Sequence, residues 1–93
     1  MYLYIIIIEW EKNILPEATA LQDLISANFT SRSITENSYL VLSNNSSVEI
    51  RNYIVNNIKH LNRIYVGEMS TTAAWKNAMS DSDEIKEMFN HVE

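Results

Sequence analysis

Two stretches of the chain are hydrophobic on both faces of an extended backbone, which is typical of strands in the middle of a sheet. They are residues 1–10 and 39–42. Residues 29–35 and 63–69 are more polar and predict edge strands, and Arg32 is the kind of charge that discourages pairing at an open edge. The only glycine, Gly67, predicts a bulge or a close backbone approach in the second edge strand. The pattern therefore predicts two central and two edge strands.

Helical spacing fills the gaps between these strands. Residues 16–28 repeat hydrophobic positions every three or four residues, and Pro16 suits the first turn because its missing N–H costs nothing there. A second helix is predicted to end near Ile58, and it begins with Ser46 and Glu49 at the spacing of a capping box. The strands and helices thus follow the order βαβ twice.

The C-terminal residues predict two further helices. Thr71 or Thr72 can cap a short helix over residues 73–75, and Asp81 can begin a last helix. Hydrophobic residues of that last helix form one stripe, made of Ile85, Met88 and Phe89.

This order predicts an α+β fold, a ferredoxin-like βαββαβ sandwich with a four-stranded antiparallel sheet and two helices on one face. The 93 residues suit one domain, with a core over 1–69 and a helical tail over 70–93. In this topology the first and third strands are central and the other two are edges, which agrees with the polarity of the four stretches.

Two helices cover only one face of such a sheet. We expect the other face to carry Tyr2, Tyr4 and alternate residues of the strand over 39–42, a hydrophobic surface larger than monomers usually expose. Either the C-terminal helices or a second copy of the chain must cover it. We favour a twofold homodimer, with an interface that includes four aromatic residues, Tyr2, Tyr4, Tyr39 and Trp75.

Composition and charge narrow the class of partner. Hydrophobic residues make up 46% and charged residues 20% of the chain, as in ordinary globular proteins, and the net charge is −5. An acidic chain is a poor non-specific ligand for nucleic acid, because such binding needs cations that neutralise phosphates. The middle of the chain is nevertheless basic and offers a candidate nucleic-acid-binding set, Arg32, Arg51, Lys59 and Arg63.

The sequence also bears on compartment and membrane association. It has no cysteine, so no disulfide or thiolate metal site forms, and this fits a cytoplasmic protein. The longest hydrophobic run, residues 2–8, is far shorter than the ~20 residues of a membrane span. It also lacks the flanks of a secretory signal. We expect no membrane partner.

Candidate chemistry is confined to the end of the first strand. Glu9 and Glu11 lie two residues apart, so in an extended strand they project from one face, and two carboxylates can hold a Mg²⁺ that keeps most of its waters. Solvated charges at the point where a strand leaves the sheet explain the same pair. His60 and His91 have no partner at ligand spacing, and no phosphate loop, zinc motif or nucleophile elbow occurs.

One family resemblance bears on these residues. The segment SYLVLSNNSSVEIRNYIVNNIKHLNRIYVGEMSTTAAW, over residues 38–75, and an opening strand that ends in an acid resemble the superfamily of CRISPR-associated protein two. Within it, the chain looks like small stand-alone relatives labelled SinR-like, over roughly residues 1–78. The distinctive matches are Ile50-Arg51, Val66-Gly67-Glu68 and Ala73-Ala74-Trp75.

The resemblance implies a ferredoxin-like dimer, association with nucleic acid and, in some members, a metal-dependent nuclease site at the end of the first strand. The family has an aspartate there, and this chain has Glu9. The longer side chain argues against catalysis, because a displacement of about 1 Å can cost on the order of 100-fold in rate. The family's additional C-terminal strand is not evident in this sequence either.

Three functions follow as expectations. The first is a dimeric, non-catalytic relative of the spacer-integration subunit, acting as a nucleic-acid-associated or protein-interaction module in a defence or mobile-element setting. The second is a weak Mg²⁺-dependent nuclease that uses Glu9, and the sequence leans against an enzyme. The third is a small acidic inhibitor, of a phage counter-defence type, whose acidic C-terminal helix mimics nucleic acid and binds a basic protein. Its acids are Asp81, Asp83, Glu84 and Glu87.

Overall fold

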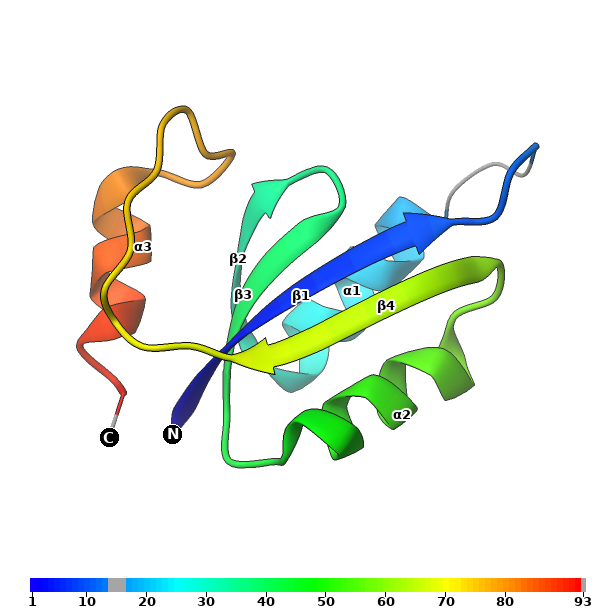
Figure 1. Cartoon of the computed structure of the whole chain (residues 1–93), viewed down its shortest axis with the longest axis horizontal. Helices are drawn as coiled ribbons and strands as arrows, with labels where there is room; N and C mark the ends of the chain where they lie inside the picture. Colours follow the sequence, from blue (N-terminus) through cyan, green and yellow to red (C-terminus); the bar gives the residue numbers. More distant parts are fainter. Residues whose placement is uncertain (14–16, 93) are drawn as a thin grey trace.

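Four strands form one antiparallel sheet in the computed structural model, which describes residues 1–13 and 17–92. The strands are β1 (Tyr2–Trp10), β2 (Thr30–Thr35), β3 (Ser38–Ser43) and β4 (Leu61–Glu68). Their order across the sheet is β2-β3-β1-β4 (Figure 1). The predicted central and edge positions are therefore confirmed, and the arrangement is consistent with a ferredoxin-like one.

Helices α1 (Ala18–Asn28) and α2 (Ser47–Asn57) pack on one face of this sheet. Even-numbered residues of β1 and alternate residues of β3 meet the hydrophobic stripes of the two helices, because side chains alternate along a strand. The buried members of this core are Tyr4, Ile6, Ile8, Leu21, Ile25, Tyr39, Val41, Ile50, Ile54 and Ile58. The predicted role of Pro16 in the first turn of α1 lies outside the described residues.

The start of α2 is fixed by the predicted capping box. The Ser46 hydroxyl accepts a hydrogen bond from the Glu49 backbone N–H at 3.2 Å, and the Glu49 carboxylate accepts one from the Ser46 N–H at 3.0 Å. These reciprocal bonds satisfy two N–H groups that a helix start leaves without partners.

The C-terminal helix α3 (Ser82–Phe89) covers part of the opposite face of the sheet. Its buried residues Ile85 and Met88 pack on Leu3, Leu40 and Leu42. The tail therefore provides the cover that we expected from a second copy. The Asp81 side chain caps α3, as predicted, by accepting a hydrogen bond from the Asp83 N–H at 2.7 Å.

The predicted assignment of Tyr2, Tyr4 and Tyr39 to this second face is wrong. Alternation along β1 puts Tyr2 on the same face as Tyr4. Tyr4 and Tyr39 belong to the core under α1 and α2, and they are only 3% and 5% exposed. Tyr4 keeps its polar tip satisfied there, because its hydroxyl donates a hydrogen bond to the Asn45 carbonyl at 2.7 Å. A tyrosine that finds such a partner packs in a core as readily as it faces a partner protein.

The short helix predicted over residues 73–75 is also wrong. The connecting segment, residues 69–81, contains no helix. Its Met79 and Ser80 N–H groups donate hydrogen bonds to the Ile34 and Ser33 carbonyls of β2, each at 3.0 Å, and Asn77 has a left-handed backbone with φ 55°. Three residues offer too few helical bonds to offset the cost of nucleation, so bonds to the sheet edge prevail.

Candidate interaction edge

The two predicted metal-binding acids are each paired with a residue at or just before the start of β4. Glu9 Oε2 lies 3.3 Å from Arg63 Nε, and Glu11 Oε2 lies 3.2 Å from His60 Nδ1. The pairing of β1 with β4 also shifts register between Glu9 and Trp10. Within residues 1–13 and 17–92, no three His, Asp or Glu side chains gather closely enough to hold a metal ion.

The four predicted phosphate-binding cations do not form one face. Arg32 faces α3, where its Nε lies 3.3 Å from Glu84 Oε2 while Nη1 donates to the Ser31 carbonyl at 2.7 Å. Arg51 lies on α2, on the opposite side of the sheet, and donates to the Asn52 side chain. Only Lys59 and Arg63 are exposed together, around the start of β4.

The acids of the predicted nucleic-acid mimic on α3 have internal partners as well. Asp81 caps the helix, Glu84 pairs with Arg32, and Glu87 Oε1 lies 3.3 Å from His91 Nε2. The Arg32–Glu84 pair links α3 to the sheet, the Asp81 cap completes its N-terminus, and the Glu87–His91 pair lies at its C-terminal end. Asp83 is exposed.

The remaining predicted interface residues, Tyr2 and Trp75, have different surroundings. Tyr2 is exposed at the start of β1. Trp75 is half-buried against α3, where its ring meets Phe89 edge to face at a centroid distance of 6.0 Å. Its Nε1–H donates to the Ser82 hydroxyl at 3.1 Å. Trp75 thus anchors the tail to its own chain.

The two edges of the sheet differ in how they are occupied. Met79 and Ser80 bind the backbone of β2, whereas the outer edge of β4 receives no hydrogen bond from any other described segment. The Met69 N–H donates to the Leu3 carbonyl and the Ile8 N–H to the Asn37 carbonyl, so after the register shift, from Arg63 to Glu68, odd residues of β4 face β1 and even residues face outward. The outward backbone groups belong to Ile64, Val66 and Glu68.

Exposed hydrophobic side chains border this free edge on the side of α3. Tyr65 is 62% exposed, and its cross-strand neighbour Ile7 is 49% exposed. The Tyr65 ring lies over Gly67, so closely that a β-carbon at Gly67 would stand 2.6 Å from Tyr65 Cε1. Gly67 therefore has neither the predicted bulge nor the predicted close backbone approach, because it pairs in register with Ile5 and its near neighbour is the Tyr65 side chain.

A second hydrophobic border lies on α2, which packs against β4. Val48 and Val55 are both exposed, and at about 100° per residue both lie roughly opposite Tyr53 on the helix. Tyr53 meets Phe29, the residue after α1, at a centroid distance of 6.3 Å. The two valines therefore lie on the side of α2 away from α1, at about 130° around the helix from the buried Ile50 and Ile54. We call β4 with these borders the interaction edge: Ile64, Val66, Glu68, Tyr65, Ile7, Val48 and Val55.

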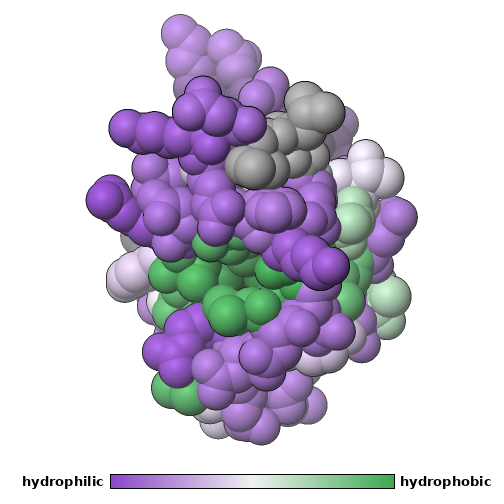
Figure 2. Space-filling view, turned by 90° about the vertical axis from the view of Figure 1, so that its right-hand side faces the viewer, coloured by the Kyte–Doolittle hydropathy of each residue, from purple (hydrophilic) through white to green (hydrophobic). Residues whose placement is uncertain are grey.

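Figure 2 views the end of the molecule where β1 ends and β4 begins. Hydrophobic residues form a band across this end, with hydrophilic residues above and below it. Trp10 and Leu61, which pair at this point, are partly buried against the helix-side core. The hydrophobic core thus reaches the surface beside the interaction edge.

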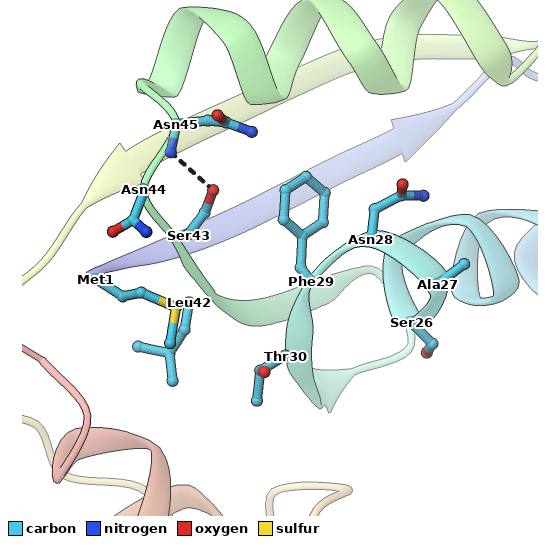
Figure 3. Close-up of a pocket in the computed structure, with 10 residues that line it drawn as sticks. All are labelled: Met1, Ser26, Ala27, Asn28, Phe29, Thr30, Leu42, Ser43, Asn44 and Asn45. Atoms are coloured by element: carbon cyan, nitrogen blue, oxygen red, sulfur yellow. Dashed lines mark hydrogen bonds between the residues drawn. The ribbon is translucent and has the colours of Figure 1, made fainter.

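A cavity of about 450 Å³ lies elsewhere, between the ends of α1 and β3 (Figure 3). Amide and hydroxyl side chains dominate its lining, and no ionisable side chain lines it. The Asn45 N–H there donates to the Ser43 hydroxyl at 2.9 Å. Its lining hydroxyls, Ser26, Thr30 and Ser43, have no His, Asp or Glu side chain in the same lining that could activate them as a base.

Sequence reasoning missed the interaction edge, although its signals were present. Edge polarity placed β4 at the border of the sheet, but only the path of residues 69–81 decides which edge stays open. Val48 and Val55 are seven residues apart and thus share one flank of a helix, outside the stripe that predicted the core.

No helix among the described residues combines the length and the hydrophobicity that crossing a bilayer requires. Comparisons of the chain with protein-family models, with curated proteins and with solved structures find no match.

Proposed function

We propose that this chain is a non-catalytic interaction module with a ferredoxin-like fold, which forms a homodimer by joining two β4 strands. The observation that carries the proposal is the asymmetry of the sheet edges, since the chain occupies its own β2 edge and leaves the longer β4 edge open. Natural proteins usually cover or charge such an edge, because unpaired N–H and C=O groups recruit another strand.

The sequence of β4 suits antiparallel pairing with itself. A twofold axis beside Tyr65 puts Ile64 opposite Val66 of the second copy. Both are outward-facing residues, so they form the hydrogen-bonded pairs. The two Tyr65 side chains then meet as a non-hydrogen-bonded pair, the closer kind, in which aromatic contacts stabilise by roughly 0.2–1 kcal/mol.

The wider relationship is part of the same proposal. We infer membership of the CRISPR-associated protein two superfamily and a role in a defence or mobile-element setting from the sequence over residues 38–75, supported by the βαββαβ order. The absence of cysteine agrees with a cytoplasmic location. The pairing of Glu9 with Arg63, and of Glu11 with His60, favours a structural over a catalytic role for these acids.

Light scattering after size-exclusion chromatography tests the dimer. We expect about twice the 10.8 kDa chain mass at high concentration, and for Tyr65→Lys a dissociation constant at least tenfold higher, because two like charges meet at the axis. Tyr2→Lys makes the same change at an exposed tyrosine of β1 and is the matched control. A chain that stays monomeric at every concentration, or a dimer that Tyr65→Lys leaves intact, contradicts the proposal.

The same chromatography with short DNA and RNA in Mg²⁺ distinguishes the nucleic-acid functions. We expect no shift at moderate salt, since the cations are dispersed and two of them pair with acids. Metal-dependent cleavage that Glu9→Ala abolishes would establish the nuclease instead.

A further inference from the structure

A second cavity, of about 290 Å³, lies between the sheet and the C-terminal tail. Ile5, Ile34 and Leu40 form its floor on the sheet, and Trp75 and Phe89 form walls above them. Every residue that lines it is hydrophobic. A site of this kind binds the apolar part of a ligand, because hydrophobic surface leaves water on binding.

Several contacts hold the walls of this cavity in place. Trp75 is fixed by its 3.1 Å hydrogen bond to Ser82 and by its edge-to-face contact with Phe89, at an interplanar angle of 87°. The ion pair between Arg32 and Glu84 ties α3 to β2. The hydrogen bonds of Met79 and Ser80 tie the end of the connecting segment to the same strand. The tail is thus held at both ends of the cavity, which opposes its collapse.

The charge at the rim indicates the other end of the ligand. An adjoining cavity of about 300 Å³ shares Ala73, Ala74 and Trp75 with the first and is also lined by Ser82 and Lys86. Lys86 is the only ionisable residue that lines either cavity. A cationic ammonium beside a hydrophobic cavity is complementary to an anionic group on an apolar chain.

We propose that this cavity binds a medium-chain fatty acid, with the hydrocarbon chain between Trp75 and the sheet and the carboxylate at Lys86. A methylene group is about as large as a water molecule, whose share of liquid volume is about 30 Å³, so the cavity holds a chain of about eight to ten carbons. The site is independent of the interaction edge, since none of the edge residues lines either cavity.

The experiment is a titration of the full chain with hexanoate, octanoate and decanoate below their micelle concentrations, followed by amide NMR shifts. We expect saturable shifts around residues 73–75 and α3, and an affinity that rises about fourfold for each added methylene. Shifts spread over the whole surface, or no saturation with decanoate, would overturn the proposal.

Three variants locate the two ends of the ligand. Lys86→Gln should weaken octanoate binding about two- to fivefold, a modest loss because the ion pair between Lys86 and the carboxylate is partly exposed. It should leave 1-octanol binding unchanged, since 1-octanol has no carboxylate. Lys76→Gln, at a lysine outside both cavities, is the matched control and should change neither. Ala74→Leu, at an exposed position of the rim, should block the binding of both octanoate and 1-octanol. The NMR spectrum of this variant should still be that of a folded protein. Unchanged octanoate binding in Ala74→Leu, or equal losses in the two lysine variants, would also overturn it.

Discussion

Tyr4 shows how a core accommodates the polar atom of an aromatic residue that strand alternation places there. Its ring fills the core beneath α2, and its hydroxyl reaches the Asn45 carbonyl at 2.7 Å. Burial raises the pKa of Tyr4, and the charges of Glu68, Tyr2 and Glu49 add to that effect. Tyr39, which lies in the same core, also has a pKa raised by burial. Both tyrosines are therefore held in their neutral form.

Tyr4→Phe should lower the free energy of unfolding by about 1 kcal/mol at neutral pH, because the Asn45 carbonyl loses its donor. The raised pKa of Tyr4 also makes the free energy of unfolding depend on pH in the alkaline range. A neutral buried tyrosine stabilises the fold fully below the unfolded-state pKa of about 10, and this contribution is lost as pH rises through the folded-state pKa. The free energy of unfolding, measured with urea from pH 8 to 11, should thus fall less steeply with pH in Tyr4→Phe than in the wild type. A slope equal to that of the wild type would contradict this.

The pKa of Glu49 is shifted in the opposite direction to those of the two tyrosines. The pKa of its carboxyl is lowered by hydrogen bonds from the Ser46 backbone and hydroxyl, against a small opposing effect of desolvation. A lowered pKa stabilises the fold above the unfolded-state value of about 4.3, and the contribution is lost as pH falls through the folded-state pKa. Glu49→Gln should flatten the acid side of the stability curve. Glu36→Gln, in the turn between β2 and β3, controls for the loss of one carboxylate.

Among the secondary-structure elements, α3 in the C-terminal tail determines whether the second face of the sheet is covered. Without α3, the sheet would expose Leu3, Leu40 and Leu42 on one face. Met88→Ala should lower the free energy of unfolding by about 2–5 kcal/mol, as expected for a buried methionine that leaves a void. Met79→Ala, at a residue 62% exposed, is the control and should change it by less than about 0.5 kcal/mol. Equal effects of the two substitutions would mean that α3 does not pack as described.

These elements also explain what the sequence alone could predict. Strand polarity, the capping box at Ser46 and the stripe of Ile85 and Met88 depend on neighbours along the chain, and all three predictions are confirmed. Alternation along β1 groups Tyr4 with Ile6 and Ile8, but which face of the sheet α1 and α2 cover depends on tertiary contacts that no local pattern contains. The open edge of β4 likewise depends on where residues 69–81 cross the sheet. Periodicity predicts faces within an element, and tertiary contacts decide what each face meets.

At the scale of the whole molecule, the proposed dimer links stability to protein concentration. A monomer unfolds at a temperature that does not depend on concentration, whereas a dimer gains stability by mass action. If folding and pairing of β4 are coupled, each tenfold increase in concentration should raise Tm by about 3–5 °C. Calorimetry over three decades of concentration measures this directly.

Variants at the interaction edge test where on the chain the dimer forms. Tyr65→Lys should remove the concentration dependence and leave the low-concentration Tm nearly unchanged, because Tyr65 is mostly exposed within one chain. Val55→Lys, on the α2 border, should weaken the dependence, and Tyr2→Lys should keep it. If Tyr2→Lys removed the dependence and Tyr65→Lys kept it, the dimer would form at the start of β1 rather than at the interaction edge.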